Sequence, residues 1–275
     1  MICRRFLKRK SFINYFFFAV CDTFESDYQF FAASIAYYTL MSIIPLFIFL
    51  FFLGMVVFHV DFKNLIPKEL FESPLKPIFL QIEKVLDKSG VISGTAALVM
   101  LWFSRGIFLS LERSFSEILK VENPAGFIYR HTVIILSIFL LWILMFLLYI
   151  AKYVLALLLP QFPELSFLSS LLVLLLLFIT LVFVYYFLLP VSIEFPFILK
   201  ISGVIFFILI LVEKAFIWFV LNVSKVSILY GSFAALIIFL MWIYYSATVV
   251  LLGAGIVKGK LIAEGEIGNE NNQLS

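Results

Sequence analysis

Long apolar runs, separated by short polar or proline-containing stretches, follow one another along the chain from residue 32 onward. A helix that crosses a hydrocarbon core of about 30 Å needs about 20 residues. We therefore expect six transmembrane helices, at residues 32–58, 91–111, 132–159, 167–189, 201–223 and 231–257. Prolines support this division, because they fall between the predicted spans in all cases except Pro45.

Two further segments have helical periodicity but are too short or too polar to cross a bilayer. Near the N-terminus, one helical face carries only apolar residues: Phe12, Ile13, Phe16, Phe17, Val20 and Phe24. A basic cluster precedes this face, so we interpret it as an interfacial helix on anionic lipid, with a cleaved signal peptide as the alternative. Residues 75–86 have the same amphipathic pattern and predict a helix on the outer surface.

The composition agrees with a membrane protein. Apolar residues make up 64% of the 275 residues and charged residues 13%, against about 25% charged in soluble proteins. A chain of this length cannot hide so much apolar surface from water, which excludes a soluble enzyme and a disordered chain. The two cysteines, Cys3 and Cys21, lie outside the long apolar runs, and we expect neither a disulfide framework nor a cysteine-based zinc site.

The distribution of Lys and Arg predicts the orientation. With six spans both termini share one side, and if that side is the cytoplasm, eleven Lys and Arg residues lie inside and six outside. This predicts a multi-pass membrane protein with both termini cytoplasmic. Its parts would be a basic N-terminus with the interfacial helix (1–31), the six-helix domain (32–257, with an outside loop at 59–90) and a polar tail (258–275).

Four charged residues lie within the predicted spans, where a charge is costly and marks a candidate site. Arg105 and Lys152 are close enough to the span ends to act as anchors. Glu213 is close to the middle of the fifth span, and its short side chain reaches neither surface. Its neighbour Lys214 points about 100° away around the helix, so each needs another partner. Two interpretations stay open: a buried structural salt bridge, or a path for a substrate or proton.

The first span also carries a hydroxyl stripe. Ser34, Tyr38 and Ser42 follow one another at four-residue spacing, and Pro45 then frees one backbone carbonyl. In lipid that carbonyl must face protein or water. The stripe is either the wall of a cavity or a face that packs on another helix.

Catalytic motifs are missing from the sequence. Neither a phosphate-binding glycine loop nor a paired-histidine zinc motif occurs, and no nucleophile, histidine and acid can be assembled into a triad. We therefore expect no enzyme activity, no cofactor and no metal. A basic groove with stacking aromatic residues is also missing, so nucleic acid is not an expected partner.

Two long motifs resemble the YihY/BrkB family of bacterial inner-membrane proteins. Residues 32–46 (AASIAYYTLMSIIPL) are similar to the first-helix signature of that family, AA-x-AYY-x-x-S-x-x-P-L. The series Leu229-Tyr230-Gly231-Ser232, Trp242-Ile243-Tyr244-Tyr245 and Leu251-Leu252-Gly253-Ala254 is similar to its C-terminal part. The family commonly has an acid after the last motif, where this chain has Gly255. The resemblance implies six membrane helices; a ribonuclease label once given to members is regarded as a misassignment.

From these patterns we expect a transporter or flippase-like protein for a lipid or other amphiphile. In this hypothesis Glu213 and Lys214 handle a polar group, Arg105 and Lys152 are candidate partners, and Ser34, Tyr38 and Ser42 line the route. The alternatives are a non-transporting scaffold in envelope maintenance and, ranked last, a membrane-bound ribonuclease. Membrane lipids are the expected partners, and the sequence leaves open whether the protein is a homo-oligomer.

Overall fold

The computed structural model describes residues 3–8, 10–58, 102–103, 105–121, 166–222 and 233–267, together with the single positions 132, 136, 143 and 147. These residues form helices and connecting turns and contain no strand. A 3₁₀ helix comes first and six α-helices follow: η1 (Cys3–Lys8), α1 (Phe12–Glu25), α2 (Tyr28–Phe58), α6 (Gly106–Leu119), α8 (Ser166–Leu188), α9 (Phe195–Asn222) and α11 (Ala234–Glu264).

Four of the predicted spans coincide with described helices. The spans at 32–58, 167–189, 201–223 and 231–257 correspond to α2, α8, α9 and α11. The predicted third span, most of the second span, the outside loop and its amphipathic helix lie outside the described residues. Two helices extend beyond the predicted spans, because α6 continues to Leu119 and α11 to Glu264.

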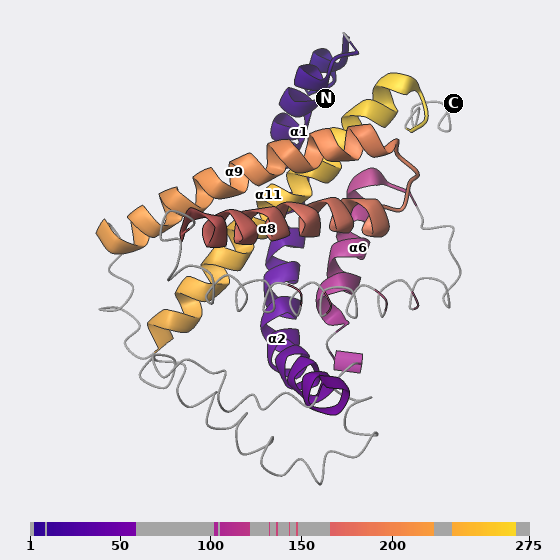
Figure 1. Cartoon of the computed structure of the whole chain (residues 1–275). Coiled ribbons are helices and arrows are strands. Elements are labelled where there is room, and N and C mark those ends of the chain that lie inside the picture. Colours follow the sequence, from indigo (N-terminus) through magenta and orange to yellow (C-terminus); the bar gives the residue numbers. More distant parts are fainter. Residues whose placement is uncertain are drawn as a thin grey trace.

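The helices do not share one axis. In Figure 1, α8 and α9 lie next to each other and cross the direction of α2 and α6 steeply, while α11 runs diagonally behind α8. The central element is α11, which contacts α1, α2, α6 and α9. The 28 residues of α9 and the 31 of α11 correspond to lengths of roughly 42 and 46 Å. Both helices therefore exceed the thickness of a bilayer core.

The buried core is concentrated at one end of the molecule, which we call the base. The base consists of α1, the start of α2 (28–36), α6, the end of α8 (181–189), the start of α9 (198–205) and the end of α11 (247–261). Large side chains without solvent exposure fill it: Tyr28, Phe115, Leu119, Tyr185, Ile201, Ile205, Leu251, Ile256 and Val257. Because α2 and α9 start there and α8 and α11 end there, these four helices alternate in direction.

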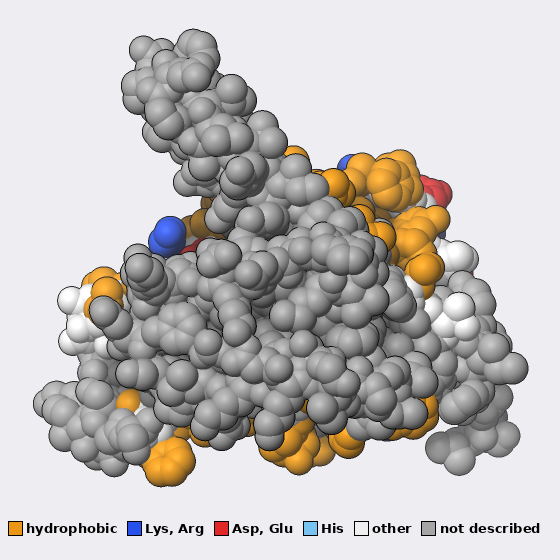
Figure 2. Space-filling model, turned by 60° about the horizontal axis from the view of Figure 1, so that its bottom comes forward, with side chains coloured by type: hydrophobic (Ala, Val, Ile, Leu, Met, Phe, Trp, Pro, Cys, Tyr) orange, Lys and Arg blue, Asp and Glu red, His pale blue; other side chains and the backbone are white. Residues whose placement is uncertain are grey.

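Away from the base, the described helices expose large apolar side chains. Leu175 of α8 and Phe207, Leu211 and Trp218 of α9 are more than half exposed. Hydrophobic side chains also reach the surface along the lower edge and the upper right of the face in Figure 2. Within the described part of the chain, α9 and residues 236–264 of α11 are long and apolar enough to cross a membrane. Apolar surface of this kind is stable in lipid and not in water.

The N-terminal helix packs with one face and exposes the other. Tyr15, Phe18 and Ala19 are buried against α11, whereas Ile13 and Phe24 of the predicted apolar face are 63% and 79% exposed. The exposed face is therefore the one expected to meet lipid. In Figure 1, α1 extends beyond the other helices next to the C-terminal end of α11.

A disulfide joins Cys3 of η1 to Cys21 of α1. This disulfide corrects the expectation, drawn from the sequence, that the two cysteines form no disulfide framework. The cysteines are 18 residues apart, so no local sequence pattern connects them. They meet because η1 folds back on α1, which brings the two Cα atoms to 5.6 Å from each other.

Candidate functional site

The charged pair predicted near the membrane centre lies on α9, away from the base. Glu213 is half-buried and Lys214 is exposed. Glu213 is one helical turn before Phe216, whose ring lies 5.4 Å from Trp242 and 6.1 Å from Tyr245 of α11. The carboxylate is therefore at the edge of the contact between α9 and α11. Within the described part of the chain, neither charge forms an ion pair.

The two candidate partners of Glu213 are not brought to it by the described structure. Arg105 precedes the first residue of α6, and its guanidinium lies 3.2 Å from the centre of the Trp102 ring, which is a cation–π contact. Lys152 lies outside the described residues. The anchoring role considered from the sequence stays a prediction.

The three side chains of the hydroxyl stripe on α2 differ in their burial. Ser42 is buried, Ser34 is half-buried and Tyr38 is 44% exposed. Ser42 and Tyr38 both approach Gly106 of α6, where a methyl group would lie 2.5 Å from the Ser42 Oγ. This part of the stripe is a helix-packing face, since a small residue on each helix allows the close approach. Pro45 lies within α2, which bends in its C-terminal half in Figure 1.

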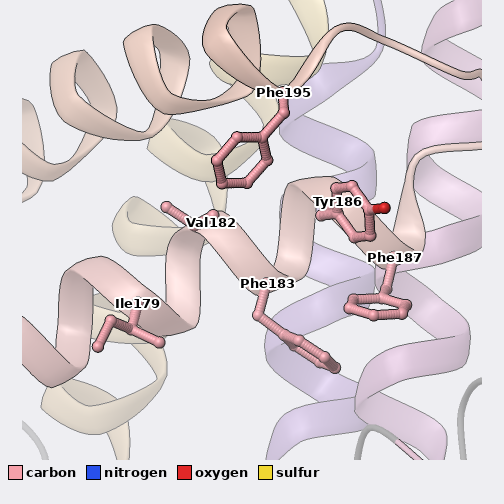
Figure 3. Close-up of a pocket in the computed structure, with 6 residues that line it drawn as sticks. All are labelled: Ile179, Val182, Phe183, Tyr186, Phe187 and Phe195. Atoms are coloured by element: carbon pink, nitrogen blue, oxygen red, sulfur yellow. The ribbon is translucent and has the colours of Figure 1, made fainter.

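A shallow apolar hollow of about 360 Å³ lies between the end of α8 and the start of α9. Figure 3 shows its lining residues, five from α8 and one from α9: Ile179, Val182, Phe183, Tyr186, Phe187 and Phe195. The rings of Tyr186 and Phe195 meet edge to face at 6.2 Å. The Tyr186 hydroxyl is the only polar group that these side chains provide, so the hollow suits a hydrocarbon chain better than a polar substrate.

A buried polar network at the base was not predicted from the sequence. Asp22 of α1 is 7% exposed and accepts hydrogen bonds from three side chains. Lys258 Nζ and Tyr28 Oη donate to its Oδ2 at 2.8 and 3.0 Å, and Ser26 Oγ donates to Oδ1 at 3.1 Å. The network therefore joins α1 and the start of α2 to the end of α11, with a charge-assisted bond at its centre.

Two glycines of α11 allow α1 and the start of α2 to pack closely around this network. A methyl group at Gly255 would lie 2.7 Å from the Tyr28 hydroxyl, and one at Gly259 would lie 2.9 Å from the Phe18 ring. A larger side chain at position 255 would therefore not fit beside Tyr28 and Ala19. Burial, the charge of Asp22 and the hydrogen bond to it together raise the pKa of Tyr28 well above its usual value of 10.

Sequence signals for this network exist but are weak. Asp22 is the one acid between Tyr15 and Thr23, on the α1 face that packs against α11. Lys258 follows the last apolar motif by one helical turn. Their separation of 236 residues left no local pattern that could connect them.

The packed base, the exposed apolar helices and the composition together define a helical membrane protein. The chain belongs to the family described as virulence factor BrkB, which matches residues 21–263 and confirms the resemblance found in the sequence. A similar curated protein is a UPF0761 membrane protein of Psychrobacter sp. (strain PRwf-1), 26% identical over 258 residues. The match covers 90% of this chain and 48% of that relative, so the chain spans about half the relative's length. No solved structure matches.

Proposed function

We propose that this protein is a multi-pass protein of the bacterial inner membrane that moves a lipid or another amphiphile between the leaflets. Both termini, and with them the base, would lie in the cytoplasm. Glu213 carries the proposal, because it is an acid within the apolar helix α9, more than two turns before the end of that helix, and no described residue pairs with it. Lys214 on the neighbouring face would complement a second charge, such as that of a zwitterionic headgroup.

The position of Glu213 supports a route along the contact between α9 and α11. The carboxylate is half-buried next to Phe216, while Lys214 and Ile217 face outward. A headgroup that moves along this edge would meet the charge of Glu213 while its chains stay in lipid. The hollow between α8 and α9 provides an apolar surface for such a chain near the base.

The test measures lipid movement by the purified protein in liposomes. A fluorescent phospholipid, quenched by dithionite from the outside, reports the fraction that crosses the bilayer. We expect wild-type protein to speed this exchange and Glu213→Gln to reduce it to the protein-free rate. Glu266→Gln, which changes an exposed acid after α11, is the matched control and should behave as wild type. Unchanged exchange with Glu213→Gln would exclude Glu213 from the mechanism.

A scaffold without transport is the second candidate, and the base favours it. The Asp22–Lys258 network and the apolar outer face of α1 form a packed end from which Phe24 and Ile13 protrude. Such an end could bind other envelope components. Wild-type protein that fails to accelerate exchange of anionic and zwitterionic lipids would favour the scaffold over the transporter.

A further inference from the structure

We propose that Cys3, Cys21 and Glu25 form a binding site for a thiophilic divalent cation such as Zn²⁺ when the two thiols are reduced. One ligand atom from each residue, two sulfurs and a carboxylate oxygen, lies within 4.8 Å of the others. This inference revises the expectation, drawn from the sequence alone, that the cysteines bind no metal.

The fold explains why these three residues meet. Cys21 and Glu25 are four residues apart on α1, so their side chains lie on the same face, one turn from each other. Cys3 reaches this face from η1, which packs against both α1 and α11. Cys3 is 3% exposed, Cys21 is half-buried and Glu25 is exposed, so the site opens to solvent on the side of Glu25 and, in part, of Cys21.

The ligand set has the chemistry of a zinc site. Thiolate sulfur binds Zn²⁺ at about 2.3 Å and carboxylate oxygen at about 2.0–2.2 Å, in tetrahedral geometry. Two tetrahedral Zn–S bonds place the sulfurs about 3.8 Å apart, so the two sulfurs, which are bonded in the disulfide, must separate after reduction to hold the ion. A water molecule would complete the four ligands on the exposed side.

Whether the two cysteines form a disulfide or bind a metal depends on the compartment in which the N-terminus lies. The proposed orientation places η1 and α1 in the cytoplasm, where thiols are kept reduced and a cysteine pair more often binds metal. Two equivalents of a cellular monothiol RSH would convert the Cys3–Cys21 disulfide to two thiols and leave RSSR. Binding of Zn²⁺ then releases the two thiol protons. Either the S–S bond or the metal would hold residues 3–8 against α1, but the two exclude each other.

The test uses the full chain, reduced and purified in detergent, with Co²⁺ as a spectroscopic substitute for Zn²⁺. We expect a near-ultraviolet thiolate-to-cobalt band that Zn²⁺ abolishes by displacement. The chain has only two cysteines, so a thiol reagent should count two reactive thiols without metal and none with it. Two reactive thiols and no cobalt band in the presence of Co²⁺ would overturn the proposal.

Variants test which residues bind the metal. Cys3→Ser and Cys21→Ser should each abolish the cobalt band, and Glu25→Gln should weaken Zn²⁺ binding by about tenfold or more. Asp27→Asn, an exposed acid just after α1, is the matched control and should bind like wild type. Binding that is unchanged by Glu25→Gln would overturn the three-ligand site.

A second experiment tests the oxidation state of Cys3 and Cys21 in cells. Thiols are trapped with acid at lysis, and the oxidation state of the pair is read by mass spectrometry. We expect two free thiols and zinc bound to protein isolated without chelator. An oxidised pair would overturn metal binding in the cell and would place the N-terminus on the oxidising side. The cobalt titration does not depend on orientation or on lipid movement, so its failure is distinct from failure of the proposed function.

Discussion

Tyr185 of α8 lies directly against Gly253 of α11, and Gly253→Ala tests how strongly the base depends on this contact. Tyr185 is fully buried, its ring stacks on Phe115 at 5.9 Å, and its hydroxyl donates to the Val250 carbonyl at 2.7 Å. A methyl group at Gly253 would lie against that hydroxyl, 2.5 Å from Cζ and 2.8 Å from Cε1 of the ring.

The loss of stability caused by Gly253→Ala follows from these contacts. Carbon atoms normally meet at 3.5–4.0 Å, so the ring must move by about 1 Å in a site without free space. Overpacking of this kind costs about 1–3 kcal/mol, and a strained hydrogen bond adds about 1 kcal/mol. The better helix propensity of Ala offsets about 1 kcal/mol. We expect a net loss of about 2 kcal/mol, which lowers Tm by roughly 5 °C.

The assay is thermal unfolding of the purified protein in detergent, followed by tryptophan fluorescence. Gly203→Ala on α9 is the control, because no atom lies within 4 Å of the added methyl group. That variant should leave Tm unchanged or raise it slightly. Tyr185→Phe removes the closest atom, so the cost of Gly253→Ala should be smaller in that background. A Tm for Gly253→Ala equal to that of Gly203→Ala would refute the packing argument.

Two further predictions concern the polar network at the base. Asp22→Asn or Lys258→Met alone should destabilise the protein by about 3–5 kcal/mol, because each leaves a buried partner without its counter-charge. Asp22→Leu with Lys258→Met should cost less, about 1–3 kcal/mol, because no charge is left unpaired but the buried Tyr28 hydroxyl loses its acceptor. Single variants that unfold like wild type would contradict this. The raised pKa of Tyr28 predicts that its contribution to stability is present below pH 10, where unfolded tyrosine is neutral, and is lost as the pH rises above that value. Denaturant unfolding between pH 8 and 11 should therefore show a flatter decline for Tyr28→Phe, and an equal slope would refute the assignment.

The candidate site could be predicted only in part. Glu213 could be found from the sequence, because an acid in the middle of a 23-residue apolar run is conspicuous without any structure. Its surroundings could not, since the contact of Phe216 with Trp242 joins two helices that no local pattern relates. The sequence also left open whether Ser42 lines a cavity or packs on another helix, because packing against Gly106 depends on where α6 lies.

The sequence by itself determined that the long helices belong in lipid, that the structure is helical and to which family the chain belongs. These properties depend on composition, on the length of the apolar runs and on local motifs. The length and apolarity of α9 and α11 follow directly from runs of residues that lipid tolerates and water does not. Only the tertiary structure decided which polar groups are buried together. Asp22 meets Lys258 across 236 residues, and Cys3 meets Cys21 where η1 turns back on α1. Such contacts depend on the relative placement of whole helices, and helix periodicity carries no information on that placement.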